Sequence, residues 1–191
     1  IGFAIYLPFI IIDAVVASDF GDANLEILLD AARKAAEARK ESFLDTRHLA
    51  DAVLRSRNPW LQKVLRDAGW APRSVGGLTM GADPVAYAVA ARSVAAQPIV
   101  DAFSVRKEAK AHGTGRRVEG NFAAGDQVVV VEDVITTGGS ALKAIEAVRE
   151  EGGTVLGILA VVDREEGGRA TLEAAGHKVV ALTTASRLGL K

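Results

Sequence analysis

The chain has 191 residues, enough for one sizeable domain or for one domain with a small appendage. Its 23 basic and 24 acidic side chains nearly cancel, so charge gives no reason to expect a nucleic-acid partner. The sequence has no cysteine, which excludes disulfides, thiolate zinc sites and cysteine nucleophiles. An apolar share of 49% with 19 glycines and only 5% aromatic residues favours a folded α/β protein over an all-β sandwich.

The first segment, residues 1–20, begins with a nearly continuous apolar run that Asp13 and Ser18 interrupt. The run is slightly shorter than the roughly 20 apolar residues that a spanning helix needs, so we expect it to be buried against the rest of the chain or a partner chain, with no membrane association. Residues 1–18 resemble a membrane segment of flagellar type III export-gate proteins.

The second segment, residues 21–74, has helical periodicity. Leu25, Leu28 and Leu29 begin an amphipathic helix, and Asp45 or Thr46 can cap a second helix. A third helix is expected after Asn58, with Gly69 placed to end it. This order of elements, with ESFLDTRHLADAVL followed by WLQKVLRDAGW, resembles one repeat of the N-terminal domain of Clp-type unfoldases, which binds adaptors and substrates. The chain contains no G-x-x-x-x-G-K-[ST] phosphate loop, which excludes the ATPase motor of that family.

The third segment, residues 75–191, alternates strand and helix patterns at the lengths of βαβ units. Its apolar strands favour a parallel sheet that helices cover on both faces. The fold class expected for the chain is therefore α/β, with a helical block at the N-terminus. Strands are expected at residues 74–77, 98–105, 127–131, 154–162 and 178–182, and helices at residues 84–95, 140–151 and 165–175.

The strongest functional signal is VVVVEDVITTGGS, residues 128–140. Four valines form a buried strand that ends in Glu132 and Asp133, and a Gly-rich turn then opens a helix. Backbone N–H groups at such a turn bind phosphate, and two carboxylates at a strand end can hold vicinal hydroxyls or a magnesium ion. Together these groups suit a ribose 5-phosphate; the alternative is a charged strand end followed by an ordinary turn.

The same string is the signature of type I phosphoribosyltransferases. Three further strings resemble the orotate phosphoribosyltransferases of this family: VGGLTMGADP (residues 75–84) their pyrophosphate loop, VRKEAKAHGTGR (residues 105–116) their flexible catalytic loop, and VVDREEGG (residues 161–168) the strand end beside orotate. The resemblance extends from Val75 to the C-terminus. It implies a pentosyltransferase that converts orotate and phosphoribosyl pyrophosphate (PRPP) into orotidine 5-phosphate and pyrophosphate, in pyrimidine biosynthesis.

The resemblance also assigns roles to residues. Glu132 and Asp133 would hold the ribose hydroxyls of PRPP. The 5-phosphate would lie on the turn formed by Thr136, Thr137, Gly138, Gly139 and Ser140, and the pyrophosphate would meet Gly76, Gly77 and the turn after them. Arg164 and Thr136 would bind orotate, because a guanidinium suits a planar anion. The catalytic loop would neutralise the leaving pyrophosphate through Arg106, Lys107, Lys110 and His112.

The resemblance further implies Mg²⁺ as the cofactor, held through PRPP and with no direct protein ligand assigned. It implies a cytoplasmic homodimer in which part of the catalytic loop reaches the neighbouring subunit's site. From the residues alone, the basic loop can also be read as a solvated charge cluster.

The segment before Val75 departs from the family pattern. Orotate enzymes begin with a Lys-Ser-Gly-type segment and a hood over the base, and no such string is present here. We therefore expect orotate turnover to be impaired. Two alternatives stay open: a non-catalytic module that binds a phosphoribosyl ligand or a peptide, and a fusion or engineered chimera of three families.

Overall fold

The computed structural model describes residues 60–94, 98–108 and 116–186. The predictions for the apolar run and for the first two helices of residues 21–74 lie outside these ranges. The third helix is α4 (Trp60–Asp67). Gly69 ends it as expected: its φ is +73°, and the N–H of Trp70 returns to the carbonyl of Leu65 at 2.8 Å.

A six-stranded sheet forms the centre of the domain, in the order β3-β2-β1-β4-β5-β6. Its strands are β1 (Ser74–Leu78), β2 (Asp101–Val105), β3 (Val118–Gly120), β4 (Gln127–Ile135), β5 (Thr154–Asp163) and β6 (Val179–Thr184). All neighbouring strands are parallel except β3, which pairs antiparallel with β2 at the edge. The remaining helices are α5 (Ala82–Ser93), α6 (Gly139–Glu150) and α7 (Gly168–Ala174). The predicted α/β class with a mostly parallel sheet is confirmed.

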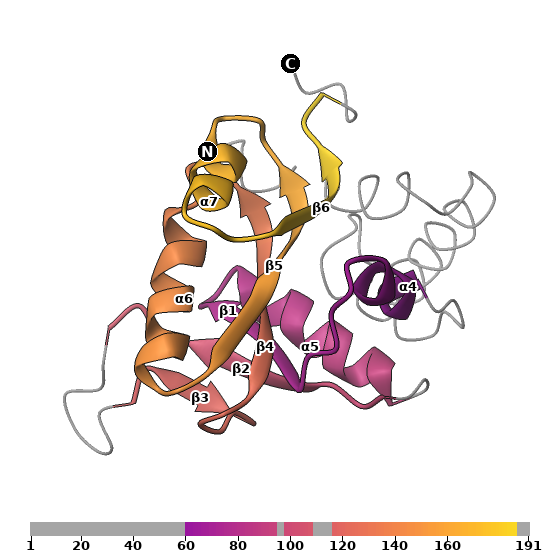
Figure 1. Cartoon of the computed structure of the whole chain (residues 1–191), viewed down its shortest axis with the longest axis vertical. Helices are drawn as coiled ribbons and strands as arrows, with labels where there is room; N and C mark the ends of the chain where they lie inside the picture. Colours follow the sequence, from indigo (N-terminus) through magenta and orange to yellow (C-terminus); the bar gives the residue numbers. More distant parts are fainter. Residues whose placement is uncertain (1–59, 95–97, 109–115, 187–191) are drawn as a thin grey trace, which may run out of the picture.

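Helices cover both faces of this sheet, with α6 and α7 on one side and α4 and α5 on the other (Figure 1). The valines of β4 show the reason, because successive side chains of a strand point to opposite faces. Val128 and Val130 belong to the core beneath α6, whereas Val129 and Val131 belong to the core beneath α4 and α5. All four are fully buried, which explains why this strand is continuously apolar.

The segment from α4 to β1 packs on the same sheet. Leu65, Ala68 and Trp70 are buried in the core that α5 shares. A Cβ on Gly157 of β5 would lie 2.1 Å from the Trp70 ring, so the glycine makes room for the indole. Lys178 donates a hydrogen bond of 2.6 Å to the carbonyl of Ala68. Residues before Val75 therefore contribute to the core of the α/β domain; the division of the chain at residues 20 and 74 stays a prediction.

Several elements differ from the expected ones, and three of these differences concern the site. The strand β3 was not predicted, because its three residues are too few to show a period. The strand β4 continues to Ile135 rather than ending at Val131, since β5 pairs with it as far as Asp163. The helix α7 begins at Gly168 instead of Glu165, because residues 164–167 form a loop.

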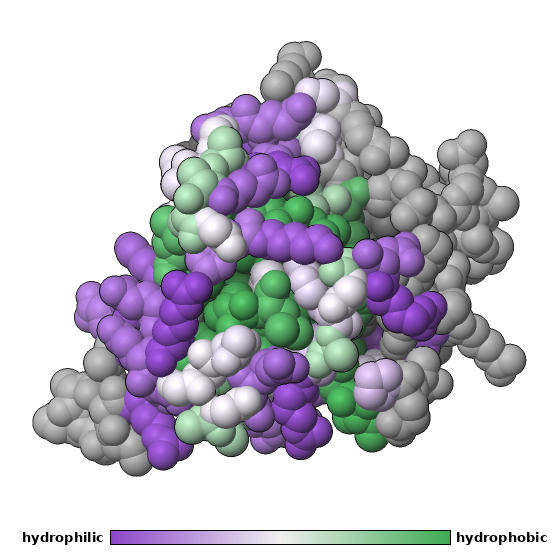
Figure 2. Space-filling view, viewed as in Figure 1, coloured by the Kyte–Doolittle hydropathy of each residue, from purple (hydrophilic) through white to green (hydrophobic). Residues whose placement is uncertain are grey.

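Much of the surface of the domain is hydrophilic, with apolar residues in the middle of the face shown in Figure 2. Within residues 60–94, 98–108 and 116–186, no helix combines the length and the apolarity that crossing a bilayer requires.

Candidate active site

The strand order of the sheet reverses beside β1, between β1 and β4. From β1 it proceeds to β2 and β3 on one side, and then returns to β4 on the other side. In open α/β sheets, ligands bind beyond the carboxyl ends of the strands at such a switch point. The described site residues predicted from the sequence lie on β1, β4 and the segments that follow β2, β4 and β5. The topology therefore brings the residues predicted to bind phosphate, ribose and orotate to the carboxyl ends of the strands.

Glu132 and Asp133 lie within the last part of β4 and not beyond its end. The pairing of β1 with β4 reaches only Val130, so the two acids follow the point at which the central sheet opens. The Glu132 side chain is 5% exposed, and its Oε1 atom is buried without a hydrogen-bond partner. Burial, together with the nearby negative charge of Asp133, raises the pKa of Glu132 from 4.5 to about 8. A buried carboxyl without a partner is costly, which makes it a candidate for ligand contact.

Asp133 lies beside the turn that follows β1. A Cβ placed on Gly81 would be 2.8 and 2.9 Å from the two oxygens of the Asp133 carboxylate. Gly81 directly precedes helix α5, and the N–H of Thr79 in the same turn donates to the carbonyl of Val105 at 2.8 Å. The turn at residues 79–81 therefore joins the ends of β1, β2 and β4, and Gly81 allows it to approach the carboxylate.

The turn after β4 presents the amino end of α6. Gly138 is the residue before the helix and has φ +82°, a conformation that favours glycine. A Cβ at Gly138 would also lie 3.0 Å from Leu172 of α7 and 3.1 Å from the carbonyl of Gly168. The first N–H groups of an α-helix have no partner within the helix, and here they lie on Gly139, Ser140 and the residue that follows. Thr136 and Thr137 complete the turn, so its geometry suits an anion.

Gly76 and Gly77 lie inside β1 and are buried. A Cβ on Gly76 would lie 2.2 Å from the carbonyl of Phe103, and one on Gly77 would lie 2.2 Å from the carbonyl of Val131. Close packing between strands thus accounts for both glycines. The turn at residues 79–81 follows β1 at the carboxyl end of the strand, and the part of Gly76, Gly77 and this turn in binding pyrophosphate stays a prediction.

The residues of the expected catalytic loop divide into two sets. Arg106 follows β2 and pairs with Glu119 of β3, with its Nη1 atom 3.1 and 3.2 Å from the two carboxylate oxygens. The N–H of Arg106 also donates to the carbonyl of Arg117, which holds the two ends of the loop together. Lys107 is exposed. Lys110 and His112 lie outside the described residues.

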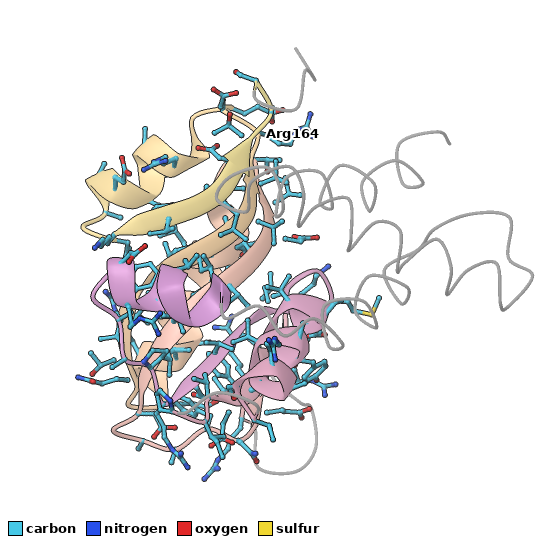
Figure 3. The ribbon with its side chains drawn as sticks, turned by 90° about the vertical axis from the view of Figure 1, so that its right-hand side faces the viewer. Arg164 is labelled. Carbon is cyan, nitrogen blue, oxygen red and sulfur yellow. The ribbon has the colours of Figure 1, made fainter. Side chains whose placement is uncertain are left out.

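Arg164 lies on the loop after β5, at the end of the domain where β5 and β6 finish (Figure 3). Its N–H donates to the carbonyl of Ile135, and the N–H of Gly168 donates to the carbonyl of Thr136. These bonds hold the loop beside the turn after β4. The Arg164 guanidinium is 2.8 Å from the Glu166 carboxylate, and its side chain is 39% exposed. Thr136 and Arg164, both predicted to bind orotate, are therefore on adjacent segments.

Sequence reasoning missed three residues that shape this site. Asp163 is buried at the end of β5, and its carboxylate accepts the N–H of Glu165 at 2.8 Å. Gly81 makes room for Asp133, and Glu119 holds Arg106. Asp163 could have been found from the sequence, because it directly precedes Arg164. The pairing of Glu119 with Arg106 could not, because β3 was not recognised as a strand.

A glycine turn at the amino end of a helix, two adjacent acids and a mostly parallel sheet are typical of α/β domains that bind phosphate-bearing ligands. Comparison with known proteins specifies the class: the phosphoribosyl transferase domain family matches residues 46–179. The chain belongs to this family. The match begins before Val75, consistent with the packing of α4 and Trp70 on the sheet.

Two curated relatives within this family are orotate phosphoribosyltransferases. The chain is 51% identical to that enzyme from Aquifex aeolicus over 117 residues, which cover 61% of this chain and 64% of the relative. It is 56% identical to the Streptomyces avermitilis enzyme over 101 residues, covering 53% and 56%. The matched part thus spans about three-fifths of the length of these relatives.

Solved structures give the same result. The orotate phosphoribosyltransferase of Mycobacterium tuberculosis H37Rv in complex with Fe(III) dicitrate is 40% identical, with a TM-score of 0.64 over 78% of this chain and 83% of that one. Its complex with PRPP is 36% identical, with a TM-score of 0.62 over 84% and 92%.

Proposed function

We propose that this chain is an orotate phosphoribosyltransferase that transfers the phosphoribosyl group of PRPP to orotate. The observation that carries the proposal is the carboxyl end of β4, where a buried acid, a second acid and a left-handed glycine turn precede the amino end of α6. Arg164 on the neighbouring loop adds a cation for an anionic base. The similarity to orotate phosphoribosyltransferases supports the same choice of substrate.

In this proposal the chain binds PRPP through three groups of atoms. The amides after Gly138 hold the 5-phosphate, with the macrodipole of the 12-residue helix α6 favouring its charge. Glu132 and Asp133 accept hydrogen bonds from the ribose hydroxyls. The turn at residues 79–81 and the basic loop with Arg106, Lys107, Lys110 and His112 neutralise the pyrophosphate.

The expected Mg²⁺ fits this site. Carboxylate oxygens are ligands that magnesium prefers, and the Oε1 atom of Glu132 is buried without a partner. The described residues contain no group of three or more His, Cys, Asp or Glu side chains that could hold a metal alone, so we propose that the ion is held mainly through PRPP. When bound, it supplies positive charge that stabilises the leaving pyrophosphate.

The reaction would be a substitution at the anomeric carbon of the ribose. The bond to pyrophosphate breaks with its electron pair, and a nitrogen of orotate forms the new bond. The residues contribute positioning and charge, without a covalent nucleophile. Arg164 and Thr136 orient the base, and the cations of the basic loop stabilise the charge of the leaving pyrophosphate.

The assay that tests the proposal follows the loss of orotate absorbance with PRPP and Mg²⁺, using the purified chain and the double variant E132Q/D133N as the control. We expect Mg²⁺-dependent PRPP binding and measurable turnover below that of the M. tuberculosis enzyme, because the sequence contains no Lys-Ser-Gly string. PRPP binding without turnover would favour the non-catalytic module. Absence of both would refute the proposal. A homodimer and a cytoplasmic location remain predictions, and sedimentation with and without PRPP would test the first.

A further inference from the structure

The loop that carries Arg164 contains a strained residue. Glu165 has φ +59°, and it is the one non-glycine residue with positive φ in the part of the chain that the structure describes. Residues other than glycine, asparagine and aspartate rarely adopt this conformation, which persists only where surrounding contacts hold it. The hydrogen bonds of Glu165 therefore show which parts of the structure its positive-φ conformation connects.

Two contacts hold Glu165 in place. On one side, the Asp163 carboxylate accepts its N–H at 2.8 Å. On the other side, the Glu165 carboxylate accepts the N–H of Ser186 at 2.7 Å and also the Ser186 hydroxyl. Ser186 follows β6, and the preceding N–H, of Ala185, donates to the carbonyl of Asp163 at 2.8 Å. The loop after β5 is thus fastened to the segment after β6.

Arg164 lies between the two residues that these contacts fix. Its own N–H is fixed to Ile135 of β4, so its backbone is held on three sides while its guanidinium remains partly exposed. That guanidinium lies 2.8 Å from the Glu166 carboxylate, with which a carboxylate ligand would compete. The Arg164 side chain therefore leaves a backbone whose two neighbours, Asp163 and Glu165, are both fixed by hydrogen bonds.

We propose that Glu165 and Ser186 are positioning residues for the base-binding half of the site, acting through Arg164. This inference rests on the proposed function. The Glu165–Ser186 contact holds the left-handed turn that directs the guanidinium towards the edge of the sheet. The phosphoribosyl half of the site depends on β4 and α6 and does not need this contact.

The variants E165A and S186A test the inference, with E173A as the matched control. Glu173 also makes an ion pair, with Arg169 on the exposed face of α7, but it does not contact the loop after β5. We expect E165A to raise the KM for orotate about 10-fold and S186A to raise it less, because loss of positioning weakens binding of the group concerned. The KM for PRPP should stay within about twofold, and E173A should change neither constant.

A second comparison separates positioning from charge. E166Q removes the carboxylate that competes for Arg164, so it should leave the KM for orotate unchanged or lower it. E165G accepts the positive φ but lacks the carboxylate, so it should behave like E165A. Equal increases in both KM values, or wild-type kinetics in E165A and E165G, would overturn the inference. An unmodified chain that neither binds nor converts orotate would refute the proposed function, and this inference with it.

Discussion

Glu132 provides the sharpest test of the site, because its burial links stability to pH. In the folded chain its pKa is about 8, compared with 4.5 for an unperturbed carboxyl, and desolvation is the main cause. The proton therefore binds more tightly to the folded state. The stabilising contribution of the protonated group is complete below pH 4.5 and is lost as the pH rises through about 8. At 1.36 kcal/mol per pKa unit, the loss amounts to about 5 kcal/mol.

The variant E132Q has nearly the same shape but cannot ionise, so it should escape this loss. We expect the free energy of unfolding of E132Q, relative to that of the unmodified chain, to increase by about 4 kcal/mol between pH 5 and pH 9. Urea titrations at several pH values measure the difference. E146Q, in which an exposed glutamate of α6 is replaced, serves as the control and should show almost no pH-dependent difference. A pH-dependent change below about 1 kcal/mol in E132Q would refute the assignment of a buried, unpaired carboxyl.

Two further predictions concern the segments on either side of the site. G138A should weaken PRPP binding at least about 10-fold and destabilise the fold by about 1–3 kcal/mol, because a Cβ at this position meets Leu172 and has an unfavourable positive φ. Calorimetry measures the affinity and thermal unfolding measures the stability. Unchanged affinity would contradict the role of the turn. E151A should lower the free energy of unfolding by about 1–3 kcal/mol, because the Glu151 carboxylate accepts hydrogen bonds from the N–H groups of Arg117 and Val118 at 2.8 and 2.9 Å. Urea unfolding measures this loss. Wild-type stability would show that water replaces the carboxylate as the acceptor.

The parallel sheet was predictable because its cause is local in the sequence. Runs of apolar residues such as Val128–Val131 can be satisfied only where both faces of a strand are covered, and the intervening helices have the length of crossovers. The edge strand β3 left no such pattern, because only Val118 of its three residues is buried. Its position depends on the pairing of Glu119 with Arg106 and on Glu151, which are distant in the sequence.

The site was predictable to the level of segments and not of atoms. The string from Val128 to Ser140 indicated that acids and a phosphate turn belong together, and the structure brings them to one edge. It did not indicate that Glu132 is buried, because the strand was expected to end at Val131, whereas β5 pairs with β4 as far as Ile135. The role of Gly76 and Gly77 in strand packing was equally hidden, because a glycine in a motif reads the same whether it faces a ligand or another strand.

The place where the domain begins can be decided by one substitution. A boundary at Val75 requires Trp70 to be dispensable, yet its side chain is 7% exposed and fills the space left by Gly157. Lys178 also lies 5.7 Å from the centre of the indole, and its ammonium reaches Ala68.

Removing a buried aromatic side chain typically costs about 3–5 kcal/mol, so W70A should lose that much stability, whereas V94A at an exposed position should lose almost nothing. Urea unfolding of both variants measures the difference. A loss below about 1 kcal/mol in W70A would show that the sheet is stable without this segment and that the domain starts at β1. The full loss would show that the last helix of the N-terminal block is part of the phosphoribosyltransferase core.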